Sequence, residues 1–127
     1  MQPQVHLIDE AWIDAPAAAV AAVVSDPANW RQWWPYLRLT VTRDRGLKGV
    51  QFAAAPAPGG GWPALAGTVE IWLEPFKSGV IVHHFLRLAP ASGQPLPARA
   101  SRRLSRRVGW HAKQVFWRLK DELEAGD

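Results

Sequence analysis

The feature that most constrains the fold is the last quarter of the chain, residues 98–125, which contains no proline and a single glycine. Its apolar residues recur at intervals of three and four positions: Leu104, Val108, Ala112, Val115, Leu119 and Leu123. This spacing follows the period of an α-helix and places these side chains on one face. A helix this long with one apolar face must be covered by other elements, so the sequence predicts a C-terminal helix packed on a sheet.

The preceding residues predict one strand, two short helices and four further strands. Residues 4–13 alternate as in a strand. Asp14 with Pro16 predicts a helix through residue 24, and Asp26-Pro27 predicts a second, short helix that ends at Pro35. Further strands are expected at residues 38–44, 49–55, 67–75 and 79–88. The order indicates an α+β fold in which the long C-terminal helix lies on a curved antiparallel sheet.

The last two strands form the clearest hairpin. With a four-residue loop at 75–78, Trp72 lies opposite Ile81, and Glu70 lies opposite His83. Alternation then directs one apolar set toward the long helix, and His84 is the polar member of that set. A slip of one residue would pair Glu70 with His84 instead, and the sequence leaves that register open. The inward set is Val69, Ile71, Leu73, Val80, Val82, His84, Leu86 and Leu88.

Composition fits one globular domain spanning residues 1–127. The chain is 48% apolar and lacks cysteine, which excludes disulfides and thiol chemistry. Its first residues do not resemble a signal peptide and no apolar run is long enough to span a membrane, so we expect a cytoplasmic protein.

Several segments together resemble the SRPBCC superfamily, the START/Bet v1-like proteins, and within it the bacterial polyketide cyclase/dehydrase-like group. They are DAPAAAVAAVVSDPANWRQWWP, GTVEIWLEP, HHFLRLAP and WRLKDELE. The resemblance implies a helix-grip fold, a sheet wrapped around the long C-terminal helix with an apolar cavity between them. Members bind lipids, sterols, polyketides or hormones, and a minority are enzymes. Five predicted strands, where the family commonly has six or seven, imply a shallower or more open cavity.

His84 and the tryptophans are the candidate ligand contacts. His84 is placed to hydrogen-bond a ligand or to act as an acid or base; the alternative is a core histidine satisfied by a backbone carbonyl or a water. Trp30, Trp33 and Trp34, with Trp62 on a glycine-rich loop, form either the rim of a pocket or a cap on the core.

We therefore expect the protein to bind a small hydrophobic or amphipathic molecule without an organic cofactor. The histidine spacing supports no metal site, and no phosphate-binding glycine loop occurs. The residues expected to contact the ligand are Trp34, Trp62, Trp72, His84, Leu86, His111 and Val115.

Two other functions stay open. One is a polyketide cyclase or dehydratase that uses His84 or His111 as acid or base. The other is an interaction module, because the net charge of +4 comes from the second half of the chain. The outward face of the C-terminal helix is best explained as a solvated surface, next as a homodimer contact, and then as a site for an acidic partner such as a membrane surface. Nucleic acid is not favoured as a partner. That face carries Arg103, Arg106, Trp110, Lys113 and Trp117, within and beyond the arginine-rich stretch 99–107.

Overall fold

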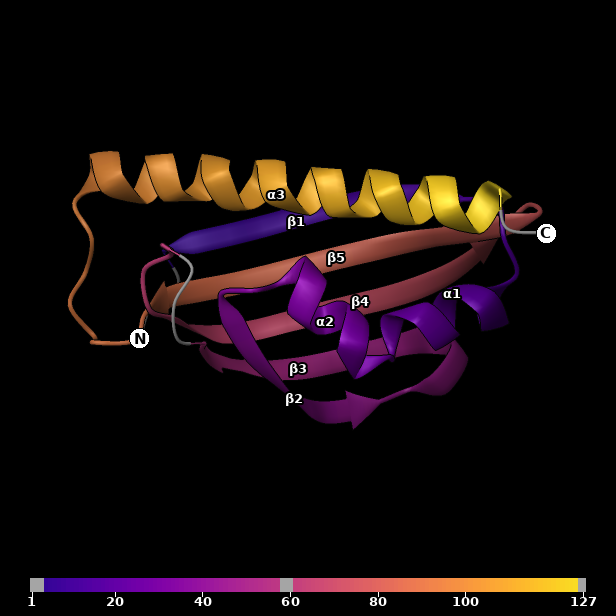
Figure 1. The fold of residues 1–127 in the computed structure, drawn as a ribbon, viewed down its shortest axis with the longest axis horizontal. Coiled ribbons are helices and arrows are strands. Elements are labelled where there is room, and N and C mark those ends of the chain that lie inside the picture. Colours follow the sequence, from indigo (N-terminus) through magenta and orange to yellow (C-terminus); the bar gives the residue numbers. More distant parts are fainter. Residues whose placement is uncertain (1–3, 58–60, 126–127) are drawn as a thin grey trace.

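The computed structural model describes residues 4–57 and 61–125, which form a five-stranded sheet and three α-helices (Figure 1). A short 3-10 helix, η1, lies between β2 and β3. The elements in chain order are β1 (Val5–Ile13), α1 (Ala17–Val24), α2 (Pro27–Trp33), β2 (Leu37–Asp44), η1 (Gly46–Lys48), β3 (Gly49–Pro56), β4 (Leu65–Phe76), β5 (Gly79–Pro90) and α3 (Ala98–Ala125).

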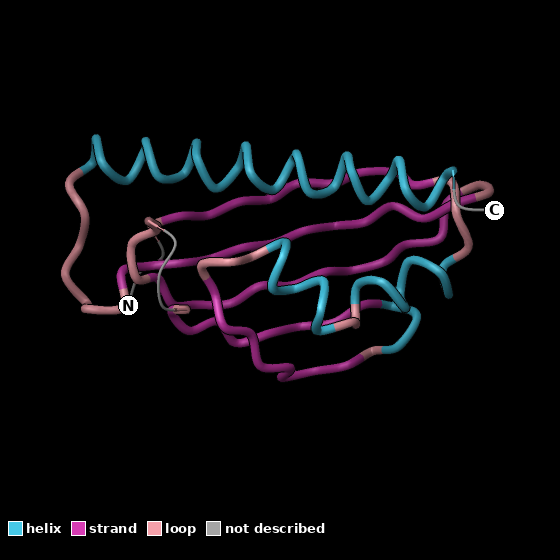
Figure 2. The backbone as a smooth tube through the Cα atoms, in the orientation of Figure 1, coloured by secondary structure: helices cyan, strands magenta, loops and turns pink. Residues whose placement is uncertain are grey.

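The sheet is antiparallel throughout, with strand order β1-β5-β4-β3-β2. The long helix α3 runs along β1 at one side of the sheet (Figure 1). The short helices α1 and α2 cover the same face farther toward β3 and β2, as the backbone trace in Figure 2 shows. This arrangement confirms the predicted helix-grip fold, including the two short helices after the first strand.

The face of the sheet that these helices cover, here called the inner face, carries the core. Directly opposed residues of an antiparallel sheet share a face. One such row crosses four strands through Val50, Ile71, His84 and Asp9. Val50 and Ile71 are buried in this row, as is His84. Residues of α3 complete the core from the other side, with Leu104, Val108, Ala112, Val115, Phe116 and Leu119 all buried.

The predicted register of the β4–β5 hairpin is wrong by two residues. The loop contains Lys77 and Ser78, because Phe76 already pairs with Gly79, and Trp72 consequently lies opposite His83. Lys77 adopts a positive φ of 55°, which lets the chain reverse within this shorter loop. A shift of two preserves the side-chain alternation. The inward set was therefore predicted correctly, whereas the Glu70–His83 pair and the one-residue slip are both excluded.

The start of α1 also differs from the prediction. Asp14 does not cap this helix, since its carboxylate accepts a hydrogen bond from the Ser78 hydroxyl at 2.8 Å, and Pro16 occupies the cap position. Asp26 does cap α2 as predicted, accepting from the Ala28 backbone N–H at 3.0 Å. The first of these two aspartates thus binds a residue of the β4–β5 loop, which is far away in sequence, instead of the N-terminus of α1.

Within the described part of the chain, no helix combines the length and the apolar character needed to cross a membrane.

Candidate ligand-binding site

His84 lies at the centre of the inner face, between the sheet and the helices. Only 1% of its surface is exposed. The Trp34 ring lies 5.7 Å from the imidazole, and the Phe116 ring of α3 lies 5.0 Å from it, centroid to centroid. Alternation along β5 directs the side chain inward, and both aromatic rings come from elements packed on that face.

Among the described residues, neither ring nitrogen of His84 finds a hydrogen-bond partner. Burial without a partner penalises the charged imidazolium, and it lowers the pKa of His84 to about 3. The ring is therefore neutral at pH 7, with one N–H donor and one nitrogen acceptor unused. Leaving such groups unsatisfied costs stability, so the arrangement requires an explanation. Among the described residues no backbone carbonyl satisfies the ring, as one form of the predicted alternative required. Its other form, a core histidine satisfied by a water, stays a prediction.

Asp9 is the cross-strand neighbour of His84 on β1. Its carboxylate turns away toward Lys113 of α3, at 3.8 Å, and is 23% exposed. Sequence reasoning did not find this neighbour, because β1 and β5 are separated by about half of the chain. Their pairing leaves no local signal in the sequence.

The tryptophans of α2 fill the space beside His84. Trp33 and Trp34 are buried, and Trp34 also lies 6.2 Å from the Phe52 ring on β3. Trp30 meets Phe52 edge to face at 4.6 Å, and its indole N–H donates to the Val24 carbonyl at 2.7 Å. Trp33 and Trp34 therefore belong to the core, while the role predicted for them at the rim of a ligand pocket stays a prediction.

Trp62, on the loop after β3, packs against Tyr36, Arg107 and His111. Its ring stacks on Tyr36, with centroids 4.1 Å apart and planes 19° apart. The Arg107 guanidinium covers the other side of the indole at 3.7 Å and donates to the Gly61 carbonyl at 3.1 Å. Burial holds the pKa of Tyr36 above its usual range, although the charge of Arg107 opposes that shift. Trp62 is thus held between a tyrosine and an arginine.

His111 has a different environment from His84. Its Nε2 lies 2.7 Å from the Trp33 carbonyl, which can only accept, so this nitrogen carries the proton. The ring also meets Trp62 and Tyr36 edge to face, at 5.8 and 6.2 Å. His111 thereby joins the end of α2 to α3. The two histidines contact different aromatic rings: His84 contacts those of Trp34 and Phe116, and His111 contacts those of Trp62 and Tyr36.

Trp72 lies on the outer face of the sheet and does not line the space between sheet and α3. Its indole N–H donates to Glu70 at 3.0 Å, and Arg45 lies over its ring at 4.5 Å. The strand alternation that places Leu73 inside requires this outcome. Two other predicted contacts, Leu86 and Val115, are buried in the core.

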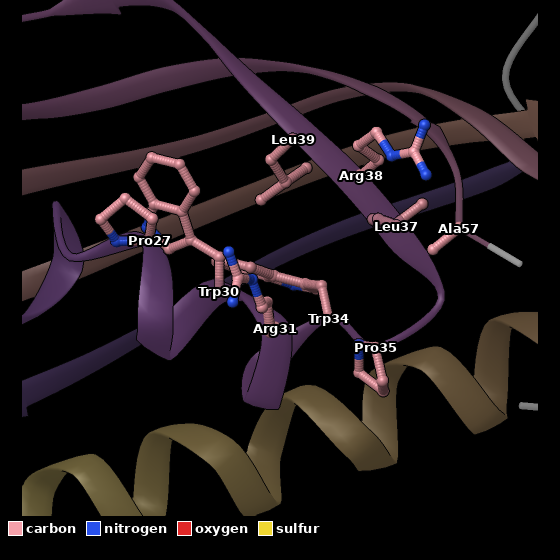
Figure 3. A pocket seen from close by; sticks show the side chains of 9 residues that line it. All are labelled: Pro27, Trp30, Arg31, Trp34, Pro35, Leu37, Arg38, Leu39 and Ala57. Atoms are coloured by element: carbon pink, nitrogen blue, oxygen red, sulfur yellow. The ribbon is translucent and has the colours of Figure 1, made fainter.

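A pocket of about 400 Å³ lies at the outer side of Trp34, between α2 and the edge strand β2 (Figure 3). Sequence reasoning did not find this pocket, because the angle between α2 and the strand that follows it is not specified by the pattern of either element. Besides Trp34, it is lined by Pro27, Trp30, Arg31, Pro35, Leu37, Arg38, Leu39 and Ala57.

A second, shallower groove of about 460 Å³ separates β1 from α3 and carries part of the arginine-rich face. Its lining includes Ile8, Arg106, Trp110 and Lys113. Trp110 and Trp117 are exposed beside it, as predicted for the outward face of the helix.

Among residues 4–57 and 61–125, no three histidine or carboxylate side chains converge to hold a metal ion.

No family model matches the chain, and no curated protein matches it in sequence. Solved structures resemble it over nearly its whole length. A Deinococcus radiodurans protein, DR_A0006, is 18% identical with a TM-score of 0.64, covering 97% of this chain and 99% of its own. A START superfamily protein from Mycobacterium smegmatis is 15% identical with a TM-score of 0.53, covering 94% of this chain and 97% of its own.

A third similar structure is the di-domain ARO/CYC StfQ from the steffimycin biosynthetic pathway. It is 15% identical with a TM-score of 0.53, and the match covers 95% of this chain and 50% of StfQ. At such identities the likeness concerns the fold. The chain therefore has the helix-grip fold of the START/Bet v1-like proteins, the SRPBCC superfamily that its sequence resembles.

Proposed function

We propose that the protein binds a small hydrophobic or amphipathic molecule in its helix grip, with one polar group of the ligand hydrogen-bonded to His84. The observation that carries this proposal is the buried imidazole, whose two nitrogens have no partner within residues 4–57 and 61–125. A ligand hydroxyl or carbonyl at this position would satisfy one of them and remove the cost of leaving it unpaired.

Aromatic surroundings support an apolar ligand body. Trp34 and Phe116 flank His84, and Leu86 and Val115 extend the apolar wall along β5 and α3. A ligand reaching His84 has to displace Trp34, since the two rings are in contact. This displacement requires α2 to shift, and α2 is joined to α3 by the contact of the Trp33 carbonyl with His111 Nε2, beside which Trp62 packs.

The pKa of His84 favours carriage over acid–base catalysis. A general base works best with a pKa near the pH at which it operates. His84, with a pKa of about 3, is a neutral hydrogen-bonding group at pH 7. This favours ligand binding over the alternative of a cyclase or dehydratase that uses this histidine.

The test compares 2-naphthol with naphthalene, two probes of nearly equal shape that differ in one hydroxyl. Binding is measured by isothermal titration for the wild type, His84→Leu and His83→Gln. His83 is the matched control, because it precedes His84 on the same strand and faces outward. We expect wild type and His83→Gln to prefer 2-naphthol by roughly tenfold, the effect of one good buried hydrogen bond.

His84→Leu should bind both probes equally while remaining folded, because it replaces an unsatisfied polar side chain by an apolar one of similar size. Equal preference for 2-naphthol in His84→Leu and the wild type would contradict the proposal. Failure of the wild type to bind either probe would contradict it as well.

A further inference from the structure

Two bare indoles stand on the outward face of α3, and in Figure 1 no other element of the described chain lies beyond that face. Trp110 is 57% exposed and Trp117 is 52% exposed, and their rings meet edge to face with centroids 5.8 Å apart. Among the described residues, cationic head groups lie over the rings of Trp12, Trp62 and Trp72, but none lies over these two. Exposed aromatic side chains that gather at one place are typical of an interface.

The two ends of the same helix face carry opposite charges. Residues 98–120 contain eight basic and no acidic side chains, and the helix then continues with Asp121, Glu122 and Glu124. Asp121 lies on the outward face, because it follows Trp117 by four positions. Arg103 lies on this face near the other end of the helix. The exposed residues of the outward face are Arg99, Arg103, Arg106, Trp110, Lys113, Trp117 and Asp121.

Arg103 and Asp121 cannot neutralise each other within one chain. They are about five helical turns apart, a rise of roughly 27 Å along the helix axis. Among the described residues, neither of them forms an ion pair. Because their separation is a whole number of turns, both side chains lie on one line along the helix.

An antiparallel pairing of two α3 helices through this face is self-complementary. A twofold axis near residue 112 places Arg103 opposite Asp121 of the partner subunit. The same symmetry places Asp121 opposite the partner subunit's Arg103, so two ion pairs form at once. A parallel pairing would instead set arginine against arginine.

The same twofold axis brings indoles and cations together at the centre of the face. It places Trp117 beside Arg106 of the partner subunit, and Trp110 beside Lys113 of the partner subunit. A guanidinium or ammonium group over an indole is attracted by the ring electrons. The two rings that no cation covers within one chain therefore lie beside cations of the other chain.

From this self-complementarity we propose that the outward face of α3 binds a second copy of this chain, with the two helices antiparallel. The four indoles form the centre of the interface, and the two Arg103–Asp121 pairs lie at its ends. An anionic membrane surface or an acidic peptide complements the arginines but sets Asp121 against like charge. The proposal does not depend on the ligand of His84, which lies on the inner face of the sheet.

The first test measures the dissociation constant of the dimer by sedimentation equilibrium of the full chain over a series of concentrations. We expect a monomer–dimer equilibrium. Trp117→Ala should raise the dissociation constant by roughly thirtyfold, the effect of truncating an aromatic residue at the centre of an interface. The side chain is half exposed in the single chain, so its loss should leave the monomer folded.

Charge reversal tests the antiparallel arrangement itself. Arg103→Glu and Asp121→Arg should each raise the dissociation constant about tenfold, because each sets like charges opposite one another twice per dimer. The combined variant Arg103→Glu/Asp121→Arg should return to within about threefold of the wild type, since the exchanged charges again meet as opposite pairs. The distance between the two residues within one chain excludes an intramolecular cause of such a rescue.

Arg118→Glu and Glu122→Arg are the matched controls. They make the same changes of charge on α3, but both residues are exposed on its other side, where they line a small hollow against α2. Neither control should change the dissociation constant. Thermal unfolding monitored by circular dichroism checks that each variant is folded.

Three outcomes would overturn the proposal. A wild type that stays monomeric at every concentration would do so, and vesicles containing phosphatidylserine that bind it through Trp110 and Trp117 would then identify a membrane surface as the partner. A dimer that Arg103→Glu/Asp121→Arg fails to restore would have its interface elsewhere. Controls that weaken the dimer as strongly as Arg103→Glu would reduce the result to an effect of net charge.

Discussion

Two neighbouring histidines of β5, His83 and His84, point to opposite faces of the sheet and differ in their hydrogen bonding. His83 points to the outer face, where its nitrogens lie 3.0 Å from Glu10 and 2.9 Å from Glu74. His84, the next residue, points inward, and no group in the described part of the chain hydrogen-bonds either of its nitrogens. The same side chain is therefore doubly paired on one face and unpaired on the other.

The rest of each face follows the same rule. On the outer face, Glu70 accepts hydrogen bonds from Gln51 at 2.7 Å and from Trp72 at 3.0 Å. The inner face is apolar and aromatic around its one buried polar residue among those described. Polar groups that serve only stability are satisfied locally, so the exception on the inner face identifies the position where function is to be sought.

The largest expected difference between the faces concerns aromatic side chains. Phe52→Ala removes a fully buried ring that contacts Trp30 and Trp34, and it should lower the free energy of unfolding by about 3–5 kcal/mol. Trp72→Ala, on the half-buried outer face, should cost about 1 kcal/mol. Urea unfolding monitored by circular dichroism measures both. Equal losses would show that the outer face contributes to the core as much as the inner one.

Acid should destabilise the protein through His84. Its pKa is about 3 in the folded chain and about 6.5 in the unfolded chain, so only the unfolded chain binds this proton between those values. The contribution of His84 to the free energy of unfolding is therefore fully present above about pH 6.5. It falls by on the order of 4 kcal/mol as the pH is lowered to 3.

Urea unfolding between pH 3 and pH 8 isolates this contribution by difference. Wild type minus His84→Leu should show the loss, whereas wild type minus His83→Gln should not reproduce it. A difference profile for His84→Leu that is flat with pH would mean that the imidazole is hydrated or paired in solution.

At pH 7 the His84→Leu variant should be more stable than the wild type, by about 1–3 kcal/mol, because the unsatisfied polar group is removed. His83→Gln should change stability by less than about 1 kcal/mol, since its partners are exposed carboxylates. Thermal unfolding of the two variants at pH 7 gives this comparison directly. A less stable His84→Leu would indicate that the buried ring makes contacts that leucine does not replace.

The smallest expected effect concerns Arg107, whose guanidinium lies over the Trp62 ring. Arg107→Gln removes the cation above Trp62 but leaves the Trp62–Tyr36 stack in place. It should cost roughly 0.5–1 kcal/mol of unfolding free energy at this exposed site. Arg106→Gln, one position away on the outward face, serves as the control and should cost less. Differential scanning calorimetry resolves the two, and equal costs would mean that the Arg107 contact adds nothing.

Local patterns were sufficient to predict most of the architecture. The apolar period of residues 98–125 specified α3 and its buried face, and alternation separated the two faces of β4 and β5. Both signals come from the geometry of a single element, so they can be read without knowing its neighbours. They also led to His84 as the polar residue on an apolar face. Trp72 was assigned to the ligand site although that same alternation places it outside.

Only the tertiary structure decided which residues meet. The pairing of Asp9 with His84 and the contact of Trp34 with that histidine both join segments distant in the chain. The wrong prediction of an Asp14 cap on α1 has the same cause, because Ser78, which binds Asp14, is distant in sequence and close only in the folded structure. A sequence specifies the period of each element locally, but partners across elements depend on how those elements pack, because contact there is set by three-dimensional distance and not by spacing along the chain.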